Sequence, residues 1–591
     1  MLYNATNARQ RTDRIMNMTK VIVWIKACEN TLIPARAQDV LNAVTGDPDE
    51  DSVARLHLPL AHRMEHRRLP YQDTGQFQPI VTNYLKGFSE LEGLVAFKPT
   101  AEGLRTAMAR REFPLQRRSV LSKVLERQYR GIDVHEAVRG NLDRLVEDQT
   151  LTVTTGHQVC LLTGPLYVPL KILNTVRLAE QLSTDRPVVP VFWMATEDHD
   201  LAEVDHVFIH GNKIQWQGGG TGAVGRMLLK NIGPVVDMVR RTMGLGSHAE
   251  QLGRVIENAY REDRTLAEAT RLFVNSIFAS TGIICLDADD AELKREFIPA
   301  MEAELLEGRL HRSVVEAEEW LDKQYKVQAP SREINLFHLK EGERSRITSG
   351  RSGWMTEAGT TWKKDQLIGE LHDHPDRFSP NVLLRPLYQE TILPNIAYIG
   401  GGGEIAYWLQ LKDAFEAFDL PMPVLLLRTS LGVIDEKDAR QLKKLGLRPE
   451  DLFLPIHELQ KKIAAEHSGI DLSIEEERKE IAAIYQRLQD RAGAIDRTLD
   501  ASVAGAAARS MKGLDHIEKK IVRAAKRRTQ EHSDSLQVVL DHFMPGGKLQ
   551  ERQENFMSFY CRYGEGFLDL IKDRLDPLEP VFNIFQEGAD Q

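Results

Sequence analysis

A run of four charged residues follows an apolar stretch and is the first candidate for chemistry. Glu197, Asp198, His199 and Asp200 come directly after the strand-like segment 187–195. Carboxylates crowded together raise each other's pKa, so the group is costly to keep without a role. It can bind a substrate amine, bind a metal ion or act as a general base, and the alternative is a solvated loop that caps a helix. We predict Asp198 and His199 as catalytic residues, together with Arg385 of the third candidate described below, and Glu197 as a binding residue, together with Gly400–Glu404 and Trp408 of that third candidate.

A metal site is not predicted here. Asp205, His206 and His210 follow the charged run, but their irregular spacing does not match a standard zinc motif.

A second candidate is the turn after the β-rich segment 151–155. It contains Thr155, Gly156, His157 and Gln158 and precedes a segment of helical spacing at 163–182. In an open α/β sheet, ligands gather at the carboxyl ends of the strands, and helix N-termini there attract anions. His157 can bind a phosphate or donate a proton to one; otherwise the turn simply needs its glycine. We predict that these four residues bind substrate or nucleotide, and that nearby Cys160 packs in the core.

A third candidate combines an arginine with a glycine-rich run. Arg385 precedes a loop that leads into a helix containing Trp408, and the loop consists of Gly400, Gly401, Gly402, Gly403 and Glu404. Glycines allow a ligand to approach the backbone closely, but the run is neither a Walker A loop nor GxGxxG. Arginine forks onto carboxylate or phosphate, and glutamate can hold an amine or hydroxyl. Arg385 in a structural ion pair, and Trp408 in simple helix packing, are the alternatives.

The elements around these residues indicate an α/β fold. Two apolar segments, 151–155 and 187–195, flank the helical segment and form a βαβ unit, the building block of a parallel sheet. Further strands are expected at 282–286, 382–384 and 424–427, with amphipathic helices at 265–279 and 291–306. The alternation is interrupted near 210–260 and 310–375, which we interpret as insertions.

The last part of the chain has a different pattern. Strands are expected to stop after about residue 450. Ile474, Ile481, Leu488 and Ile495 recur every seven residues, and a second helical pattern follows across Leu514 and beyond. This spacing predicts an antiparallel coiled-coil hairpin, with a final helical segment after it. The predicted domains are an N-terminal extension (1–66), a core (67–449) and a helical C-terminal part (450–591).

Bulk composition limits the function classes. The 591 residues are 42% hydrophobic and 27% charged, which is ordinary for a globular protein. The net charge of −10 argues against a nucleic-acid partner. Four scattered cysteines make a disulfide framework unlikely and favour a reducing cytoplasm, and no segment is apolar over the roughly 18 residues that a membrane span needs.

Several strings in order along the chain resemble the BshC family, the cysteine-adding enzymes of bacillithiol biosynthesis. The strings are Thr155–Gln158, Leu162–Tyr167 with Lys171, Pro190–Trp193 with Glu197–Asp200, Arg385–Pro386 with Gln389 and Pro394, Gly400–Trp408, and Leu549–Arg552. The resemblance covers residue 72 to the end and places Gly164, Tyr167, Lys171 and Gln389 in the binding site. Members often have glutamine where this chain has His157, and Gly-Gly-Pro-Gly-Glu where it has Gly400–Glu404.

The resemblance implies a Rossmann-like core shaped like that of nucleotidyltransferases, two connecting insertions, and a coiled coil that supports a homodimer. It also implies the substrates L-cysteine and glucosaminyl-malate and the product bacillithiol. Amide formation from a free carboxylate is uphill, so we expect activation by ATP, with or without Mg²⁺. Asp198 or His199 would accept a proton from the attacking amine or orient it. The alternatives are a ligase acting on another small amine and a non-catalytic coiled-coil scaffold.

Overall fold

The computed structural model describes residues 60–87, 89, 91–184, 186–351, 353–468, 474–528 and 530–588. Most of the predicted N-terminal extension lies outside the described residues. Of that segment, the short helix α4 (Leu60–Arg63) and the start of strand β1 (Met64–Pro70) are described, and the compact unit that carries the sheets spans Met64–Gln591.

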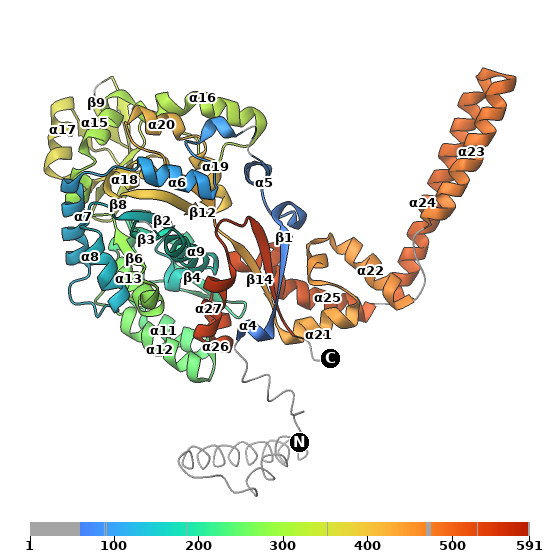
Figure 1. The fold of residues 1–591 in the computed structure, drawn as a ribbon, viewed down its shortest axis with the longest axis horizontal. Helices are drawn as coiled ribbons and strands as arrows, with labels where there is room; N and C mark the ends of the chain where they lie inside the picture. The colour runs from blue at the N-terminus through green and yellow to red at the C-terminus, as the bar shows by residue number, and fades with distance from the viewer. Residues whose placement is uncertain are drawn as a thin grey trace, which may run out of the picture. The chain divides into compact units, whose positions relative to one another are not determined.

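The core is a five-stranded sheet in which every neighbouring pair of strands is parallel (Figure 1). Its strands lie in the order β13 (Val424–Leu427), β12 (Asn395–Gly400), β2 (Leu151–Gln158), β3 (Val188–Ala195) and β6 (Ile284–Asp287). The chain extends the sheet to one side of β2 through β3 and β6, and to the other side through β12 and β13. The order therefore reverses between β2 and β12, and such a reversal opens a crevice at the carboxyl ends of the strands. The predicted Rossmann-like core is confirmed.

Helices cover this sheet because its strands are apolar on both faces. The helices before and within the first βαβ unit are α5 (Pro79–Lys86), α6 (Ala101–Arg110), α7 (Leu115–Gln128), α8 (Glu136–Arg144) and α9 (Tyr167–Leu182). Helix α13 (Leu266–Phe278) matches its prediction and begins with a capping box between Thr265 and Glu268. The helix expected at 291–306 is two helices, α14 (Ala291–Arg295) and α15 (Ile298–Glu307), and a proline lies in the first turn of the second, where a proline is tolerated.

Both predicted interruptions of the α/β pattern have their own structure. The first contains a short helix α10 (Leu201–Val204), an antiparallel pair β4 (His206–Ile209) and β5 (Asn212–Gln215), and helices α11 (Gly233–Met243) and α12 (Ser247–Ala259). The second contains α16 (Arg309–Gln324), α17 (Lys364–Asp373) and an antiparallel sheet ordered β10 (Thr361–Trp362), β9 (Gly353–Thr356), β8 (Glu343–Gly350), β7 (Leu336–Lys340) and β11 (Phe378–Pro380).

The strand predicted at 382–384 is wrong. These residues form the turn before α18 (Arg385–Ile392). The side-chain oxygen of Asn381 accepts hydrogen bonds from the backbone N–H groups of Leu383 and Leu384, which curls the chain into the helix. Three apolar residues are too short a run to distinguish a strand from a buried turn.

The prediction that strands stop after residue 450 is also wrong. Strand β15 (Val581–Glu587) lies between β1, to which it is antiparallel, and β14 (Ser430–Ile434), to which it is parallel. The rest of this part is helical, with α21 (Glu436–Leu445), α22 (Ile456–Ser468), α25 (Gln530–Phe543), α26 (Met557–Tyr563) and α27 (Glu565–Arg574). The segment after residue 545 is therefore helical through α27 and ends in the strand β15.

The predicted helical hairpin is confirmed (Figure 1). Helices α23 (Glu475–Ile495) and α24 (Asp500–Arg528) run antiparallel. Along α23, Arg478 bonds to Asp515 of α24 and the later Tyr485 bonds to the earlier Ser510. The turn between the two helices lies at 496–499.

Two connecting helices complete the core, α19 (Gly402–Trp408) and α20 (Lys412–Ala417). Within the described residues, no helix is both long enough and apolar enough to cross a membrane.

Candidate active site

The ends of β2 and β3 bring two predicted groups into direct contact. Gln158 ends β2, and its amide donates to Asp198 Oδ2 at 2.6 Å and to Glu203 Oε2 at 2.7 Å. The other oxygen of Asp198 accepts from the backbone N–H groups of His199, at 2.7 Å, and of Asp200, at 3.4 Å. Burial alone would raise the pKa of Asp198, but these hydrogen bonds and the charge of Arg344 lower it. Asp198 is thus a well-oriented carboxylate, charged near neutral pH.

The ends of β2 and β12 meet around a buried ion pair. Lys171, on the first turns of α9, donates to the carbonyl of Gly156 at 2.8 Å and pairs with Glu404. Glu404 also accepts from the Tyr398 hydroxyl at 2.5 Å and from the backbone N–H of Gly401 at 2.7 Å. Burial lowers the pKa of Lys171 and would raise that of Glu404, but the pairing with Lys171 leaves the pKa of Glu404 below its ordinary value. The pair ties the glycine-rich loop to the first βαβ unit.

His157 is a neutral imidazole in this structure. Burial, with the neighbouring charge of Lys171, lowers the pKa of His157 to about 3. Its Nε2 lies 3.3 Å from the Tyr167 hydroxyl, and the two rings meet edge to face. His157 therefore fits hydrogen bonding better than proton donation at neutral pH.

Arg385 lies among aromatic rings. Its guanidinium carbon is 5.6, 5.4 and 5.9 Å from the ring centres of Trp193, Tyr398 and Trp408, and its Nη1 donates to Gln389 at 3.0 Å. No carboxylate pairs with it among the described ion pairs, so the structural ion pair considered from sequence is not formed there. Cation–π contacts hold the charge while leaving it uncompensated by an anion.

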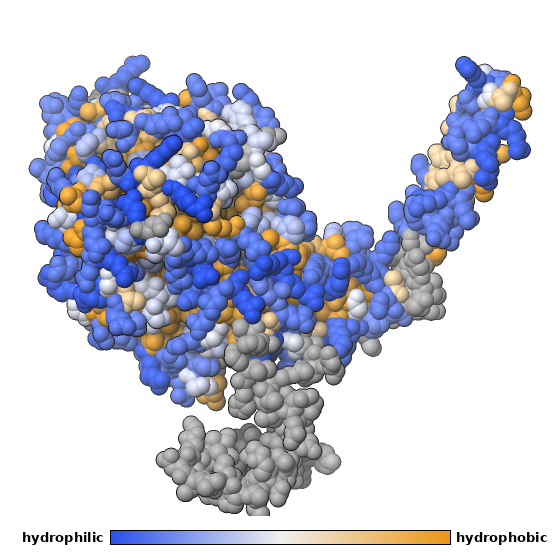
Figure 2. All heavy atoms as spheres, viewed as in Figure 1, coloured by the Kyte–Doolittle hydropathy of each residue, from blue (hydrophilic) through white to orange (hydrophobic). Residues whose placement is uncertain are grey.

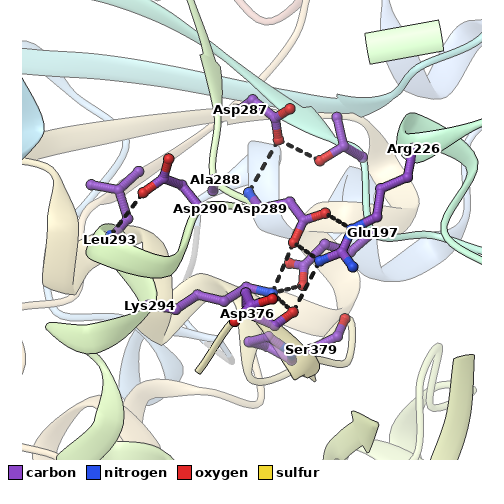
Figure 3. A network of polar contacts seen from close by, with 12 residues as sticks. Glu197, Arg226, Asp287, Ala288, Asp289, Asp290, Leu293, Lys294, Asp376 and Ser379 are labelled. Atoms are coloured by element: carbon purple, nitrogen blue, oxygen red, sulfur yellow. Dashed lines mark hydrogen bonds and ion pairs between the residues drawn. The ribbon is translucent and has the colours of Figure 1, made fainter. Parts of the chain in front are cut away.

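Glu197 belongs to a buried network of charges at the end of β6 (Figure 3). Lys294 on α14 pairs with Glu197 at 2.5 Å and with Asp289 at 3.0 Å, and Arg226 forks onto Asp289 with two bonds of 2.6 Å. Burial raises the pKa of Glu197, and the positive charge of Lys294 acts against this rise. The ion pair with Lys294 therefore holds Glu197 in place, and with it the turn that leads from β3 to Asp198.

His199 is exposed and contacts the second insertion. Arg344 on β8 donates through Nη1 to His199 Nδ1 at 3.1 Å, and the same guanidinium stacks on Phe337 at 3.9 Å. Arginine has no acceptor, so Nδ1 of His199 accepts in this contact and is occupied by Arg344 in this structure.

Two family models match the chain in succession. The N-terminal Rossmann-like domain of bacillithiol biosynthesis BshC matches residues 64–429, and its C-terminal coiled-coil domain matches 432–587. The chain belongs to the BshC family.

Curated relatives agree with this assignment along nearly their whole length. A protein of Flavobacterium johnsoniae is 38% identical over 525 residues, which is 87% of this chain and 98% of the relative. One from Christiangramia forsetii is 37% identical, covering 88% of this chain and 99% of the relative, and one from Geobacillus kaustophilus is 29% identical, covering 86% and 97%. All three carry the provisional name cysteine ligase BshC.

Several predicted site residues of this BshC-family chain have side chains turned into the protein. Thr155 donates to the carbonyl of Ile399 at 2.7 Å, Trp408 is buried and stacks on Tyr398, and Gln389 is buried beside Glu390. Gly164 has a φ of 65°, and an added Cβ would lie 2.8 Å from that of Cys160. The contacts of these residues are internal to the protein. Burial raises the pKa of the Cys160 thiol to about 12, as expected for a core cysteine.

Sequence reasoning missed three residues of the site. Arg344, Lys294 and Tyr398 contact His199, Glu197 and Glu404 respectively. Arg344 and Lys294 come from segments 145 and 97 residues along the chain from their partners, so no local pattern could pair them. Tyr398 lies two residues before Gly400, and this closeness to the glycine-rich run was the available signal.

The region also lacks an evident protein-only metal cage. Across the part of the chain that the structure describes, no three or more His, Cys, Asp or Glu side chains are grouped to hold an ion.

Proposed function

We propose that this BshC-family protein is a ligase that joins the carboxyl group of L-cysteine to the amine of glucosaminyl-malate and so forms bacillithiol. One observation supports it most: the three motif blocks that resemble the family meet at the carboxyl ends of β3, β2 and β12, through the Gln158–Asp198 bond and the Lys171–Glu404 pair. The names of the relatives give the substrate class.

Amide formation requires an activated carboxyl group. We infer that ATP activates cysteine as an acyl-adenylate or acyl-phosphate, because a free carboxylate does not react with an amine at neutral pH. Arg385 and the Gly400–Gly403 loop suit the anionic part of such an intermediate, since the loop has no side chains and the guanidinium has no paired carboxylate. Mg²⁺, if used, would be held chiefly by phosphate and water, as is usual for this ion.

The acceptor amine needs orientation and loss of a proton. Asp198 is charged near neutral pH and held by Gln158, so it can accept a hydrogen bond from the amine. Its lowered pKa makes it a weak base, so orientation is its main proposed task. His199 is the proposed proton acceptor, after its Nδ1 is released by Arg344. We place the reaction in the cytoplasm, where thiols remain reduced.

We also propose that the protein forms a homodimer through the hairpin. Apolar side chains on the hairpin are exposed in the single chain, and Figure 2 shows apolar patches along it. They are Ile484, Leu488, Ile495, Leu499, Ile517 and Ile521. Two helices that leave this many large apolar residues in water gain free energy by covering them with a second copy.

Purified protein tests the proposal directly. With L-cysteine, glucosaminyl-malate and ATP, bacillithiol should form and be detected by thiol labelling and mass spectrometry. D198N and H199A should lose about 100-fold or more of the turnover while remaining folded, whereas D200N, which removes the neighbouring exposed carboxylate, should stay active. Near-normal turnover of D198N would contradict the role assigned to Asp198. If product formed only with another amine, the proposed acceptor, glucosaminyl-malate, would be wrong.

A further inference from the structure

Two arginines from distant parts of the chain come together near the carboxyl end of β13, because Arg428 bonds to Glu551, the residue before Arg552. Arg428 follows β13 directly, and Arg552 ends a short 3-10 helix, Gln550–Arg552, in the C-terminal part. The catalytic core and the C-terminal part therefore each contribute one positive charge to this place.

The guanidinium of Arg428 is held by hydrogen bonds and by an aromatic ring. It donates to Glu551 Oε1 at 2.7 Å, to the Thr429 carbonyl at 3.0 Å and to Ser430 Oγ at 3.1 Å. Its guanidinium carbon lies 5.1 Å from the centre of the Tyr167 ring. A Cβ added to Gly401 would be 3.9 Å from its Nε, so Arg428 borders the glycine-rich loop.

The segment before Arg552 is pinned to β14. Glu551 accepts from the backbone N–H of Leu431 at 3.0 Å, and Gln550 accepts from that of Val433 at 2.9 Å. Both side chains are buried. Two residues after Arg552, the Glu554 carbonyl accepts from the backbone N–H of Leu166 at 2.8 Å, so the segment that carries Arg552 is held between β14 and the start of α9.

Arg552, unlike Arg428, has no carboxylate partner among the described ion pairs. Its side chain is exposed, and among the described residues it makes no hydrogen bond or ion pair. Loss of hydration and the nearby charge of Arg428 lower the pKa of Arg552, while Glu551 and Tyr167 act in the opposite direction. Glu551 is already committed to Arg428, so Arg552 is a spare cation beside another cation, an arrangement that an anion relieves.

Two cations near the glycine-rich loop have no carboxylate partner among the described ion pairs. Lys171 pairs with Glu404 and Arg428 pairs with Glu551, whereas Arg385 and Arg552 pair with neither. Cations without a paired carboxylate suit an anionic ligand.

We propose that Arg552 binds an oxyanion of the substrate, a carboxylate or a phosphate, at the Gly401 end of the crevice, and that the Glu551–Arg428 pair positions it there. The C-terminal part then completes the active site of the core. The inference rests on the proposed function for the identity of the oxyanion, since the dicarboxylate of glucosaminyl-malate and the phosphates of ATP are the two sources of this chemistry.

Binding measurements test the proposal without requiring turnover. Isothermal titration calorimetry of the full-length protein would use glucosaminyl-malate and ATP as separate probes, on the wild type, R552Q, R552K and K548Q. Lys548 is an exposed cation four residues before Arg552, so K548Q is the matched loss of charge. R552Q should weaken one probe by roughly 10- to 100-fold, as expected for one charge-assisted hydrogen bond. R552K should recover part of the affinity, and K548Q should bind as the wild type does.

The pattern of loss identifies the oxyanion. Weakened glucosaminyl-malate binding assigns Arg552 to a carboxylate, and weakened ATP binding assigns it to a phosphate. Unchanged binding of both probes by R552Q, or no binding of either by the wild type, overturns the proposal. If R552Q weakens binding but the wild type joins no cysteine to glucosaminyl-malate, the proposed function fails while the anion site stands.

Discussion

At the scale of single residues, the site depends on groups whose charge is set by burial and by the hydrogen bonds around them. Asp198 stays charged because Gln158 and two backbone N–H groups hold it, and His157 stays neutral because burial outweighs the nearby carboxylates. His157 lies near the end of β2 and Asp198 follows the neighbouring strand β3, yet Asp198 is suited to hold an amine and His157 to accept or donate a neutral hydrogen bond. The division of roles follows from burial and hydrogen bonding.

The neutral state of His157 makes stability depend on pH. Its pKa is about 3 when folded and ordinary, about 6.5, when unfolded. The unfolded chain therefore binds more protons between these values, so stability is lost as the pH falls below about 6.5. Relative to H157Q, the wild type should lose about 2 kcal/mol more of its unfolding free energy between pH 7 and pH 5.

Urea unfolding at the two pH values measures this difference. Equal losses in wild type and H157Q would contradict a buried neutral imidazole. H157Q should also keep most of its activity, because a glutamine side chain can make the same neutral hydrogen bonds.

The Lys171–Glu404 pair should matter for stability as well as for the site. K171M leaves Glu404 buried without its cation, and E404Q leaves Lys171 without its anion, so each should cost about 3 kcal/mol of unfolding free energy. The double variant K171M/E404Q should cost clearly less than the two losses together. Additive losses in a double-mutant cycle would show that the pair is not coupled.

At the scale of elements, the motif blocks and four of the five parallel strands could be predicted because their signals are local, whereas β12 (Asn395–Gly400) was not predicted. Leu151–Thr155, the segment 187–195 and Val424–Leu427 are short apolar runs that end in polar residues, and the structure has a strand at each. The strand at 382–384 could not be distinguished from a buried turn, because Asn381 decides its conformation through side-chain bonds that no periodicity records.

Strand β15 escaped prediction for another reason. Its partners are β1 and β14, and the pairing of Met64 with Glu587 spans almost the whole described chain. A run of seven residues at the end of a helical region gives no sign of such a distant partner.

The seven-residue repeat in the hairpin was also only partly informative. Ile481 is half-buried against α24, whereas Leu488 and Ile495 in the same row are 45% and 80% exposed. A straight helix has about 3.6 residues per turn, so a strict seven-residue row drifts around it. The drift turns Leu488 and Ile495 away from α24 and onto the face that a second copy would cover in the proposed dimer.

This face leads to a prediction about assembly. L488E and I495E place charges in the proposed dimer interface, so either should shift the protein towards monomer at micromolar concentration. K479E, on an exposed polar position of the same helix, should leave the oligomeric state unchanged. Size-exclusion chromatography with light scattering reads the mass, and a wild-type monomer would exclude the hairpin dimer.

At the scale of the whole molecule, the C-terminal part is tied to the chemistry of the core. Glu551 reaches Arg428 at the end of β13, and β15 joins β14 to β1, so residues from the two ends of the described chain share one sheet. The fold class and the three motif blocks were accessible from sequence. The ion pairs that unite them, such as Lys294 with Glu197, were not, because long-range packing determines them.

Deleting the gene in its host and profiling cell thiols by labelling and mass spectrometry tests the central claim most directly. We expect bacillithiol to disappear and glucosaminyl-malate to accumulate, with the wild-type gene restoring bacillithiol and the D198N variant failing to do so at equal protein levels. Unchanged bacillithiol in a host without a second copy would contradict cysteine addition as the reaction of this protein.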